Sequence, residues 1–314
     1  MKLLVFRLVL LENTDFSGGH MFKIRGFSLI FIICLLAACS QENVVPKEQL
    51  QEEKMDENIV VTADGKLTFK IMNNIEAPKE TVDTIKDEIL KAYDDIMQSI
   101  HTSYVPSEQI TIFLNGEDTE SWGFASRIEL AISQEGFYPL VHEMTHSLLG
   151  YGGNFDTDHG YFTQEGYAVY MDEQFSKSEY DIEKYMKYFM DSDKLIPISK
   201  LIEPYQDDAY FRPNLTNLNE LNTLRWMSYT HAASFVKYLI DTYGLEKFEN
   251  IYDKKDLANK IEEVYGKGVH EIEMDWLAFI NNQPGFTYEE KFKSPDFYDK
   301  NTIILQLDPI YFKK

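Results

Sequence analysis

Two histidines and a glutamate stand at the spacing H-E-x-x-H: His142, Glu143 and His146. In a helix, residues four apart lie on one face, so His142 and His146 would point their imidazoles at one place. Two such imidazoles can bind a single zinc ion. Glu143 is turned by about 100° around the helix axis, where a carboxylate can act as general base towards a water at the metal. The spacing therefore predicts a metal-dependent hydrolytic site.

Local signals predict a helix around these residues. Pro139 suits a first helical turn, where its missing N–H costs nothing, and Gly150 supplies a stop. The apolar side of this helix consists of Leu140, Val141, Met144, Leu148 and Leu149. A chance match to the motif or a solvated surface helix is the competing interpretation. It does not account for polar groups placed among apolar neighbours, because buried polar groups need partners.

A catalytic zinc site needs a third protein ligand and one open position. Glu165 follows His146 by 19 residues, and Thr163 is expected to cap the helix in whose first turn Glu165 lies. The competing interpretation of Glu165 is an acidic residue favoured by the helix dipole. Three polar residues of the loop at 154–160 remain alternatives as third ligand or as partners of the ligands: Asp156, Asp158 and His159.

The two motifs together, H-E-x-x-H at 142–146 and E-G-x-A-x-Y at 165–170, resemble the gluzincin class of zinc metallopeptidases. The chain is most similar to the peptidase MA-like branch of that class, over roughly residues 105–280. The resemblance implies that Glu165 is the third zinc ligand. The metzincin pattern does not fit, since this chain has Leu149 and Gly152 where that class has Gly and His.

Residues 21–38 read as a lipoprotein signal peptide. Lys23 and Arg25 precede a short apolar stretch at 27–36, and the segment Leu-Ala-Ala-Cys ending at Cys39 resembles the bacterial lipobox. The resemblance implies cleavage before Cys39 and lipid attachment to it. A transmembrane helix is the alternative, but it requires about 18 apolar residues, more than are present. The sequence thus predicts a lipid-anchored protein on the extracytoplasmic face of the membrane.

The flanking segments fit that interpretation. Residues 1–20 do not resemble the start of a signal peptide, so Met21 is the expected start of the natural chain. Residues 39–58 are polar and lack an apolar period, which predicts a flexible tether. Cys34 would leave with the signal peptide, so neither a disulfide nor a thiolate metal site is expected. A composition rich in Lys, Glu, Ile, Asn and Tyr is typical of a low-GC Gram-positive bacterium.

The chain is strongly acidic, with a formal charge of −22. Removal of residues 1–38, which carry four basic and two acidic groups, would make that charge −24. Such a chain is not expected to bind nucleic acid phosphates. It would also be repelled by anionic lipid head groups, so the acyl chain on Cys39 is the expected membrane contact. The sequence does not indicate which oligomeric state the protein adopts.

Hydrophobic periodicity predicts an α+β, zincin-like fold with a mixed-sheet lobe at 59–160 and a mainly helical lobe at 161–280. Strands are expected at 67–72, 110–114 and 127–132, with an amphipathic helix over 82–100 between the first two. Further helices are expected at 177–191, 225–243, 245–252, 256–265 and 269–280. The extension at 281–314 contains a β-like run at 302–307, interpreted as an edge strand or a docked segment.

By resemblance, the strand at 127–132 borders the cleft and pairs with substrate backbone; the alternative is an ordinary core strand. The candidates for the donor that stabilises the oxyanion are Tyr229, His231 and Tyr170. The competing interpretation is that these side chains only pack in the core, as Tyr and His more often do. The predicted function is a zinc metallopeptidase with a peptide or protein substrate, in which Glu143 is the general base. The alternative is an inactive zinc-binding envelope lipoprotein that recognises a protein partner.

Overall fold

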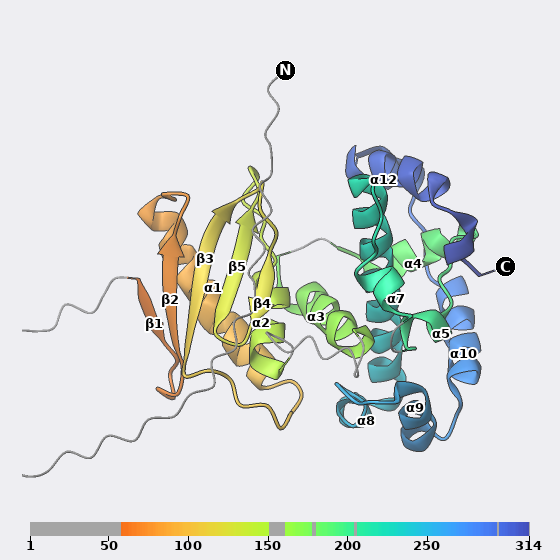
Figure 1. The fold of residues 1–314 in the computed structure, drawn as a ribbon, viewed down its shortest axis with the longest axis horizontal. Helices are drawn as coiled ribbons and strands as arrows, with labels where there is room; N and C mark the ends of the chain where they lie inside the picture. Colours follow the sequence, from red (N-terminus) through yellow and green to blue (C-terminus); the bar gives the residue numbers. More distant parts are fainter. Residues whose placement is uncertain (1–57, 151–160, 178–179, 204–205, 294, 314) are drawn as a thin grey trace, which may run out of the picture. The chain divides into compact units, whose positions relative to one another are not determined.

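The computed structural model describes residues 58–150, 161–177, 180–203, 206–293 and 295–313. The signal-peptide, lipidation and tether predictions, apart from Asn58, therefore lie outside the described residues. The fold is α+β, with a five-stranded mixed sheet followed by a mostly helical remainder (Figure 1). Within the described ranges, no helix combines the length and the apolar character needed to span a bilayer.

The sheet has the strand order β1-β2-β3-β5-β4. The strands are β1 (Ile59–Val61), β2 (Thr68–Asn73), β3 (Gln109–Gly116), β4 (Trp122–Phe124) and β5 (Arg127–Ile132). The three inner strands β2, β3 and β5 run parallel, and β1 and β4 pair antiparallel at the two edges. The predicted strands at 67–72, 110–114 and 127–132 are confirmed as these inner strands. The two edge strands were not predicted, because three residues are too few for an alternating pattern.

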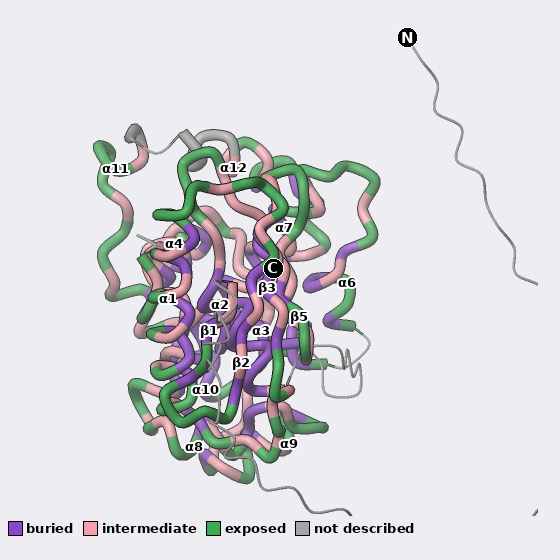
Figure 2. The backbone as a smooth tube through the Cα atoms, turned by 90° about the vertical axis from the view of Figure 1, so that its left-hand side faces the viewer, coloured by how far each residue is buried: buried purple, intermediate pink, exposed green. Residues whose placement is uncertain are grey.

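One face of the sheet is buried against the helix α1 (Lys79–Met97). Paired apolar residues cross that face in register, such as Ile71 opposite Ile112, which in turn lies opposite Ile128. The ring of Phe69 on β2 meets that of Tyr93 on α1 edge to face. Figure 2 shows buried backbone running through the strands and α2 (Leu140–Leu149). This packed layer fixes the sheet on which the site is built.

The helical remainder is organised around the 26-residue helix α7 (Leu218–Tyr243). The helix α3 (Phe162–Phe175) packs along α7, and α2 packs on α3, α1 and the strands β4 and β5. The other helices are α4 (Ile182–Asp191), α5 (Ile198–Leu201), α6 (Asp208–Phe211), α8 (Leu245–Glu249), α9 (Leu257–Tyr265), α10 (Val269–Asn281), α11 (Tyr288–Lys293), α12 (Pro295–Gln306) and the 3-10 helix η1 (Pro309–Tyr311).

The predicted helices are confirmed, with shifted ends. The helix expected from residue 225 begins at Leu218, because the Asn217 side chain accepts hydrogen bonds from the N–H groups of Asn219 and Glu220. The helix expected over 177–191 begins at Ile182, where the Asp181 carboxylate accepts from the Lys184 N–H. Capping side chains, more than hydrophobic period, set these boundaries.

The strand expected at 302–307 is wrong. Residues 302–306 belong to α12, and Ile304 and Leu307 are buried three residues apart, a helical spacing. Since α12 packs against α7, the alternative prediction of a docked segment is the correct one. Thr302, Ile303 and Ile304 are β-branched and favour strands, but they are helical here because tertiary packing overrides local propensity.

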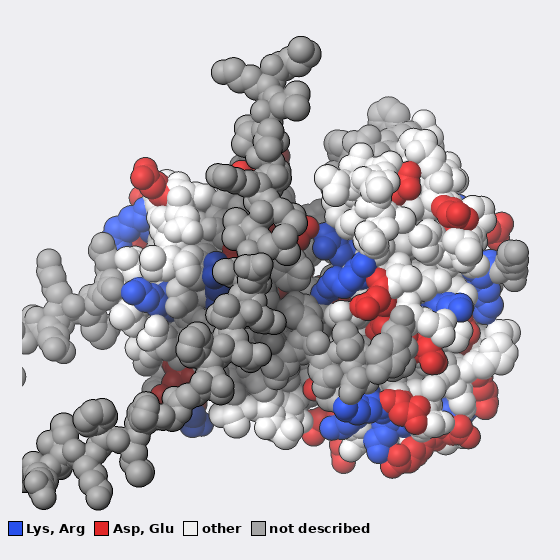
Figure 3. Space-filling view, in the orientation of Figure 1, with Lys and Arg blue, Asp and Glu red and all other residues white. Residues whose placement is uncertain are grey.

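Both signs of charge are spread over the described surface. Figure 3 shows Lys and Arg side chains interspersed with Asp and Glu on the face in view. Several ion pairs are local, such as Lys79 with Asp83 and Lys91 with Asp95, each four residues apart on α1. Exposed pairs of this kind contribute little to stability, because water and salt screen them.

Candidate metal centre

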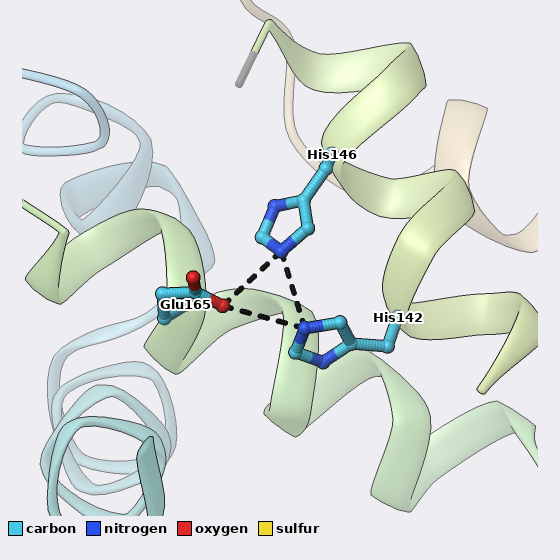
Figure 4. Close-up of side chains that lie close together, drawn as sticks. All are labelled: His142, His146 and Glu165. Atoms are coloured by element: carbon cyan, nitrogen blue, oxygen red, sulfur yellow. Dashed lines mark hydrogen bonds and ion pairs between the residues drawn. The ribbon is translucent and has the colours of Figure 1, made fainter. Parts of the chain in front are cut away.

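Three donor atoms meet where α2 faces α3 (Figure 4). The Nε2 atoms of His142 and His146 lie 3.2 Å apart. Oε2 of Glu165 lies 3.3 Å from the first nitrogen and 3.2 Å from the second. His146 and Glu165 are buried, and the His142 side chain is 12% exposed. The structure thus brings together the three residues that the sequence predicted as metal ligands.

The helix α2 places its two histidines as the sequence predicted. It begins after Pro139 and ends at Gly150, which has a φ of 112° that favours glycine. One turn separates His142 from His146, so both imidazoles project from the same face. The local signals thus suffice to position two of the three donors.

Glu165 is positioned by tertiary contacts. It lies in the first turn of α3, which begins at Phe162, and Tyr161 rather than Thr163 precedes the helix. The predicted cap at Thr163 is therefore wrong; its hydroxyl accepts a hydrogen bond from the Asp253 N–H instead. The carboxylate of Asp207 accepts from the Tyr161 N–H at 3.1 Å and helps to hold the start of α3.

A glycine lets α3 approach α7 closely. A Cβ atom added at Gly166 would stand 2.8 Å from backbone atoms of Ala232 on α7. Real Cβ atoms do not approach backbone so closely, so the two helices can be this near only with glycine at 166.

The donor set fits a metal ion. Ligand atoms about 2.0–2.1 Å from a tetrahedral zinc ion stand about 3.3–3.4 Å from one another, and the three observed separations are 3.2–3.3 Å. Two nitrogen lone pairs directed at one another and at a carboxylate oxygen repel unless a cation lies between them. The buried group of His142, His146 and Glu165 can therefore hold a metal ion.

The electrostatics of the group favour a cation. Burial alone would raise the pKa of Glu165, but the neighbouring imidazole of His146 and the guanidinium of Arg212 outweigh burial and hold that pKa well below its usual range. Burial lowers the pKa of His146 to about 4. The pKa of His142 rises to about 9, because its hydrogen bond to Glu165 and the charge of Glu143 overcome burial. The imidazole pair thus shares one proton beside a carboxylate, and a metal ion would displace that proton.

The second oxygen of Glu165 is held by two residues of the helical part. Arg212 donates from Nη2 to Oε1 at 2.8 Å, and the Tyr229 hydroxyl donates to the same oxygen at 2.7 Å. Arg212 also donates to the Tyr229 oxygen at 2.5 Å. The Tyr229 ring lies parallel to that of His142, with centroids 6.1 Å apart. The carboxylate is thus fixed with one oxygen towards the imidazoles and the other towards these donors.

Sequence reasoning missed Arg212. It lies 47 residues after Glu165, directly after the last residue of α6. Its guanidinium stands over the ring of Tyr161 at 4.8 Å. The sequence offers one weak indication of its role. The chain has only five arginines, and Arg212 lies beside aromatic residues.

A cavity of about 230 Å³ opens beside the donors. Residues 120–123 line it from β4 and the segment before it. Glu143, Arg225 and Tyr229 line it from α2 and α7 together with the three donors, and Arg212 lines it from the end of α6. Glu143 is 7% exposed, and burial raises its pKa to about 7. A carboxylate with a pKa near neutrality, facing a cavity beside metal ligands, has the properties of a general base.

The strand that borders this cavity is β4. The strand at 127–132, which was expected to border the cleft, is β5 and pairs on both sides, with β3 and β4. That expectation is wrong, and the alternative of a core strand is correct. A Cβ atom at Gly123 of β4 would stand 2.1 Å from the carbonyl oxygen of Glu143, so glycine brings the edge strand against α2.

Two candidate donors do not line the cavity. The His231 ring is fully buried and uses both nitrogens, since Nε2 accepts from the Ile196 N–H at 3.0 Å and Nδ1 lies 2.7 Å from the Met227 carbonyl. Tyr170 packs against Tyr167 on α3, with ring centroids 5.7 Å apart. The candidate roles of these two residues are corrected to packing. Of the three candidates, the structure brings Tyr229 alone to the metal centre.

The other candidates cannot be placed. Asp156, Asp158, His159 and Cys39 lie outside the described residues. A comparison of the chain with protein-family models and with curated proteins found no match. The function of this chain is therefore inferred from the geometry of its site.

Proposed function

We propose that this protein is a gluzincin-type zinc metallopeptidase. One observation carries the proposal: His142, His146 and Glu165 form a buried donor triangle, and Glu143 faces the cavity beside it. Two imidazoles and one carboxylate are the donors that zinc takes in catalytic sites that keep one position open. Iron(II) sites can share this donor set, so the identity of the metal is part of the proposal.

Bound zinc would polarise a peptide carbonyl and lower the pKa of water to about 7. Glu143 would accept the proton of the attacking water and return it to the leaving amine. Its burial supports this role, because the raised pKa lets the same carboxylate accept and release a proton near neutral pH. Arg212 and Tyr229 keep Glu165 oriented, and Tyr229, which lines the cavity beside His142, is the candidate donor to a developing oxyanion.

The edge strand β4 would align the substrate. Among the described strands β4 pairs with β5 alone, and Trp122 and Gly123 of β4 line the cavity, so an extended peptide aligned along β4 would pass the three donors. Main-chain hydrogen bonds to such an edge bind a peptide regardless of its side chains. This arrangement supports a peptide or protein substrate over a small metabolite.

The proposal is tested by metal content and peptide cleavage. We expect one equivalent of zinc in purified protein, hydrolysis of a peptide library, and loss of activity with a chelator that zinc restores. A matched sample of Lys260→Gln, which changes a surface charge on α9, is expected to behave as wild type. Zinc binding without any hydrolysis would contradict the proposal and favour the inactive, partner-binding lipoprotein.

We further propose that the enzyme is held on the extracytoplasmic face of the membrane by lipid on Cys39. The signal peptide at 21–38 and the lipobox ending at Cys39 support this. Cys39→Ser is expected to release the protein from the membrane fraction or leave its precursor unprocessed. Membrane-bound protein of unchanged mass in this variant would instead favour an uncleaved transmembrane anchor.

A further inference from the structure

We infer that Arg225 binds the free C-terminal carboxylate of the substrate, which would make the enzyme a C-terminal exopeptidase. The inference rests on the proposed function and names its substrate class. Arg225 lines the same cavity as the donor triangle and Glu143. It lies on α7 one turn before Tyr229, and the ring of Tyr229 lies parallel to that of His142. Its guanidinium is therefore on the side of α7 that faces the cavity next to the donor triangle.

The two arginines of the cavity differ in what they hold. Arg212 is committed to the interior, since it donates to Glu165, to Tyr229 and to the Phe211 carbonyl. Arg225 bonds at the cavity rim to Glu120, at 3.2 Å, and to Asn222, at 3.0 Å. Only Arg225 therefore has a guanidinium that a ligand can engage without disturbing a residue of the metal centre.

A ligand carboxylate can take the place of Glu120 as the partner of Arg225. The Arg225 side chain is 25% exposed, whereas that of Glu120 is 57% exposed and precedes β4 in a connecting segment. Solvent-exposed ion pairs of this kind contribute little. A substrate carboxylate can replace the Glu120 carboxylate like for like, and Asn222 keeps the guanidinium in place. A planar guanidinium also suits two parallel hydrogen bonds to a carboxylate.

The direction of β4 determines which end of a peptide reaches Arg225. Glu120 precedes Trp122, the first residue of β4, so Arg225 stands near the N-terminal end of this strand. A peptide added antiparallel to β4, the more stable pairing, runs with its C-terminal end towards residue 120. A peptide added in parallel would place its ammonium group there, against the charge of Arg225. The antiparallel arrangement is therefore favoured by both hydrogen bonding and charge.

The test compares short peptides of one sequence that end in a free acid, in a C-terminal amide, or in a free acid behind an acetylated N-terminus. Zinc-loaded full-length wild type, Arg225→Gln and Arg225→Lys are assayed, and product lengths are determined. Arg127→Gln is the matched control, because Arg127 also pairs with a carboxylate, that of Glu129, but does not line the cavity. Binding of each peptide to Glu143→Gln is measured in parallel.

We expect wild type to prefer the acid over the amide by about 10- to 100-fold in kcat/KM, since a charge-assisted hydrogen bond is lost with the amide. Arg225→Gln should remove this preference, mainly through KM, while Arg225→Lys keeps part of it and Arg127→Gln keeps all of it. Acetylation should have little effect. The expected products are short C-terminal fragments.

Other results separate the two proposals. Equal cleavage of acid and amide, an unchanged preference in Arg225→Gln, or a requirement for a free N-terminus would each overturn the inference and leave the metallopeptidase proposal intact. No cleavage of any peptide, with selective binding of the acid by Glu143→Gln, would overturn the metallopeptidase proposal but support recognition by Arg225. Absence of both cleavage and acid-selective binding would overturn both.

Discussion

The structure contains two buried histidine environments that differ in where the ring nitrogens point. In the helical core, Nε2 of His231 accepts from the Ile196 N–H, its Nδ1 lies against the Met227 carbonyl, and its ring lies parallel to Phe189 at 5.3 Å. In the candidate metal centre, Nε2 of His146 faces Nε2 of His142 and the Glu165 carboxylate.

This contrast teaches that burial by itself does not identify a functional histidine. Burial lowers the pKa of both His146 and His231 to about 4. A ring that bonds one backbone donor and one backbone acceptor is satisfied as a neutral group. The two Nε2 atoms of the other site converge on each other and on a carboxylate oxygen, so this group needs a positive charge between its members, which one shared proton or a metal ion would supply.

The largest effect is expected at Glu143. Glu143→Gln keeps the size of the side chain but cannot accept a proton near pH 7. We expect kcat to fall by 10²–10⁴-fold, or about 3–5 kcal/mol of barrier. Zinc content and melting temperature should stay at wild-type values, which are measured on the same sample. Full activity in this variant would remove Glu143 from the mechanism.

The two histidine environments should respond in opposite ways to truncation. His142→Ala should abolish tight metal binding and change the stability of the metal-free protein little. His231→Ala should keep one metal equivalent but lower the free energy of unfolding by about 2–4 kcal/mol, because it leaves the Ile196 N–H and Met227 carbonyl without partners and opens a cavity. Urea titration and metal analysis of both variants check this. Metal loss in folded His231→Ala would break the contrast.

A smaller effect is expected at Arg212. Arg212→Gln removes the charge that orients Glu165 while leaving all three donors in place. Loss of such a partner typically weakens metal binding by about 10–100-fold, which competition with a chromogenic chelator would measure. Arg127→Gln serves as the control for the loss of one positive charge. Unchanged affinity in Arg212→Gln would show that Tyr229 alone holds the carboxylate.

The smallest effect concerns a carboxyl group next to the His231 environment. Glu183 accepts from the Ser234 hydroxyl, which itself accepts from the Trp276 indole N–H. Burial raises the pKa of Glu183 from 4.5 to about 7. The folded state therefore binds a proton more tightly than the unfolded state, so the native protein loses stability as pH rises from about 4.5 to about 7.

Glu183→Gln removes this cost. We expect the variant to exceed wild type in stability by on the order of 1–3 kcal/mol above pH 7, after allowance for partial solvent screening. The difference should vanish below about pH 4.5, where the carboxyl is protonated in both states. Urea unfolding of both proteins at several pH values tests this, and a pH-independent difference would contradict the assignment of Glu183.

The extent to which the sequence could predict the site depends on how local each contact is. His142 and His146 were predictable, because a helix alone places residues four apart together. Glu165 required a family resemblance, since nothing within its own helix points it at α2. Arg212 and the edge strand β4 were missed, because their relation to the site exists only after folding. His231 was misassigned because its sequence context resembles that of Tyr229 two residues away, while its partners, Ile196 and Phe189, come from other elements.

The close contact between Gly166 and Ala232 sets how far apart α3 and α7 lie, and so where Glu165 stands in the candidate metal centre. Any side chain at this position, even a methyl group, would act as a spacer between α3 and α7. Glu165 is the adjacent residue, and Tyr229, which holds it, lies on the opposite helix. The absence of a side chain at residue 166 therefore sets the distance between the Glu165 carboxylate and the two imidazoles. In directed evolution of this protein, position 166 would be an unforgiving one although it touches neither metal nor substrate.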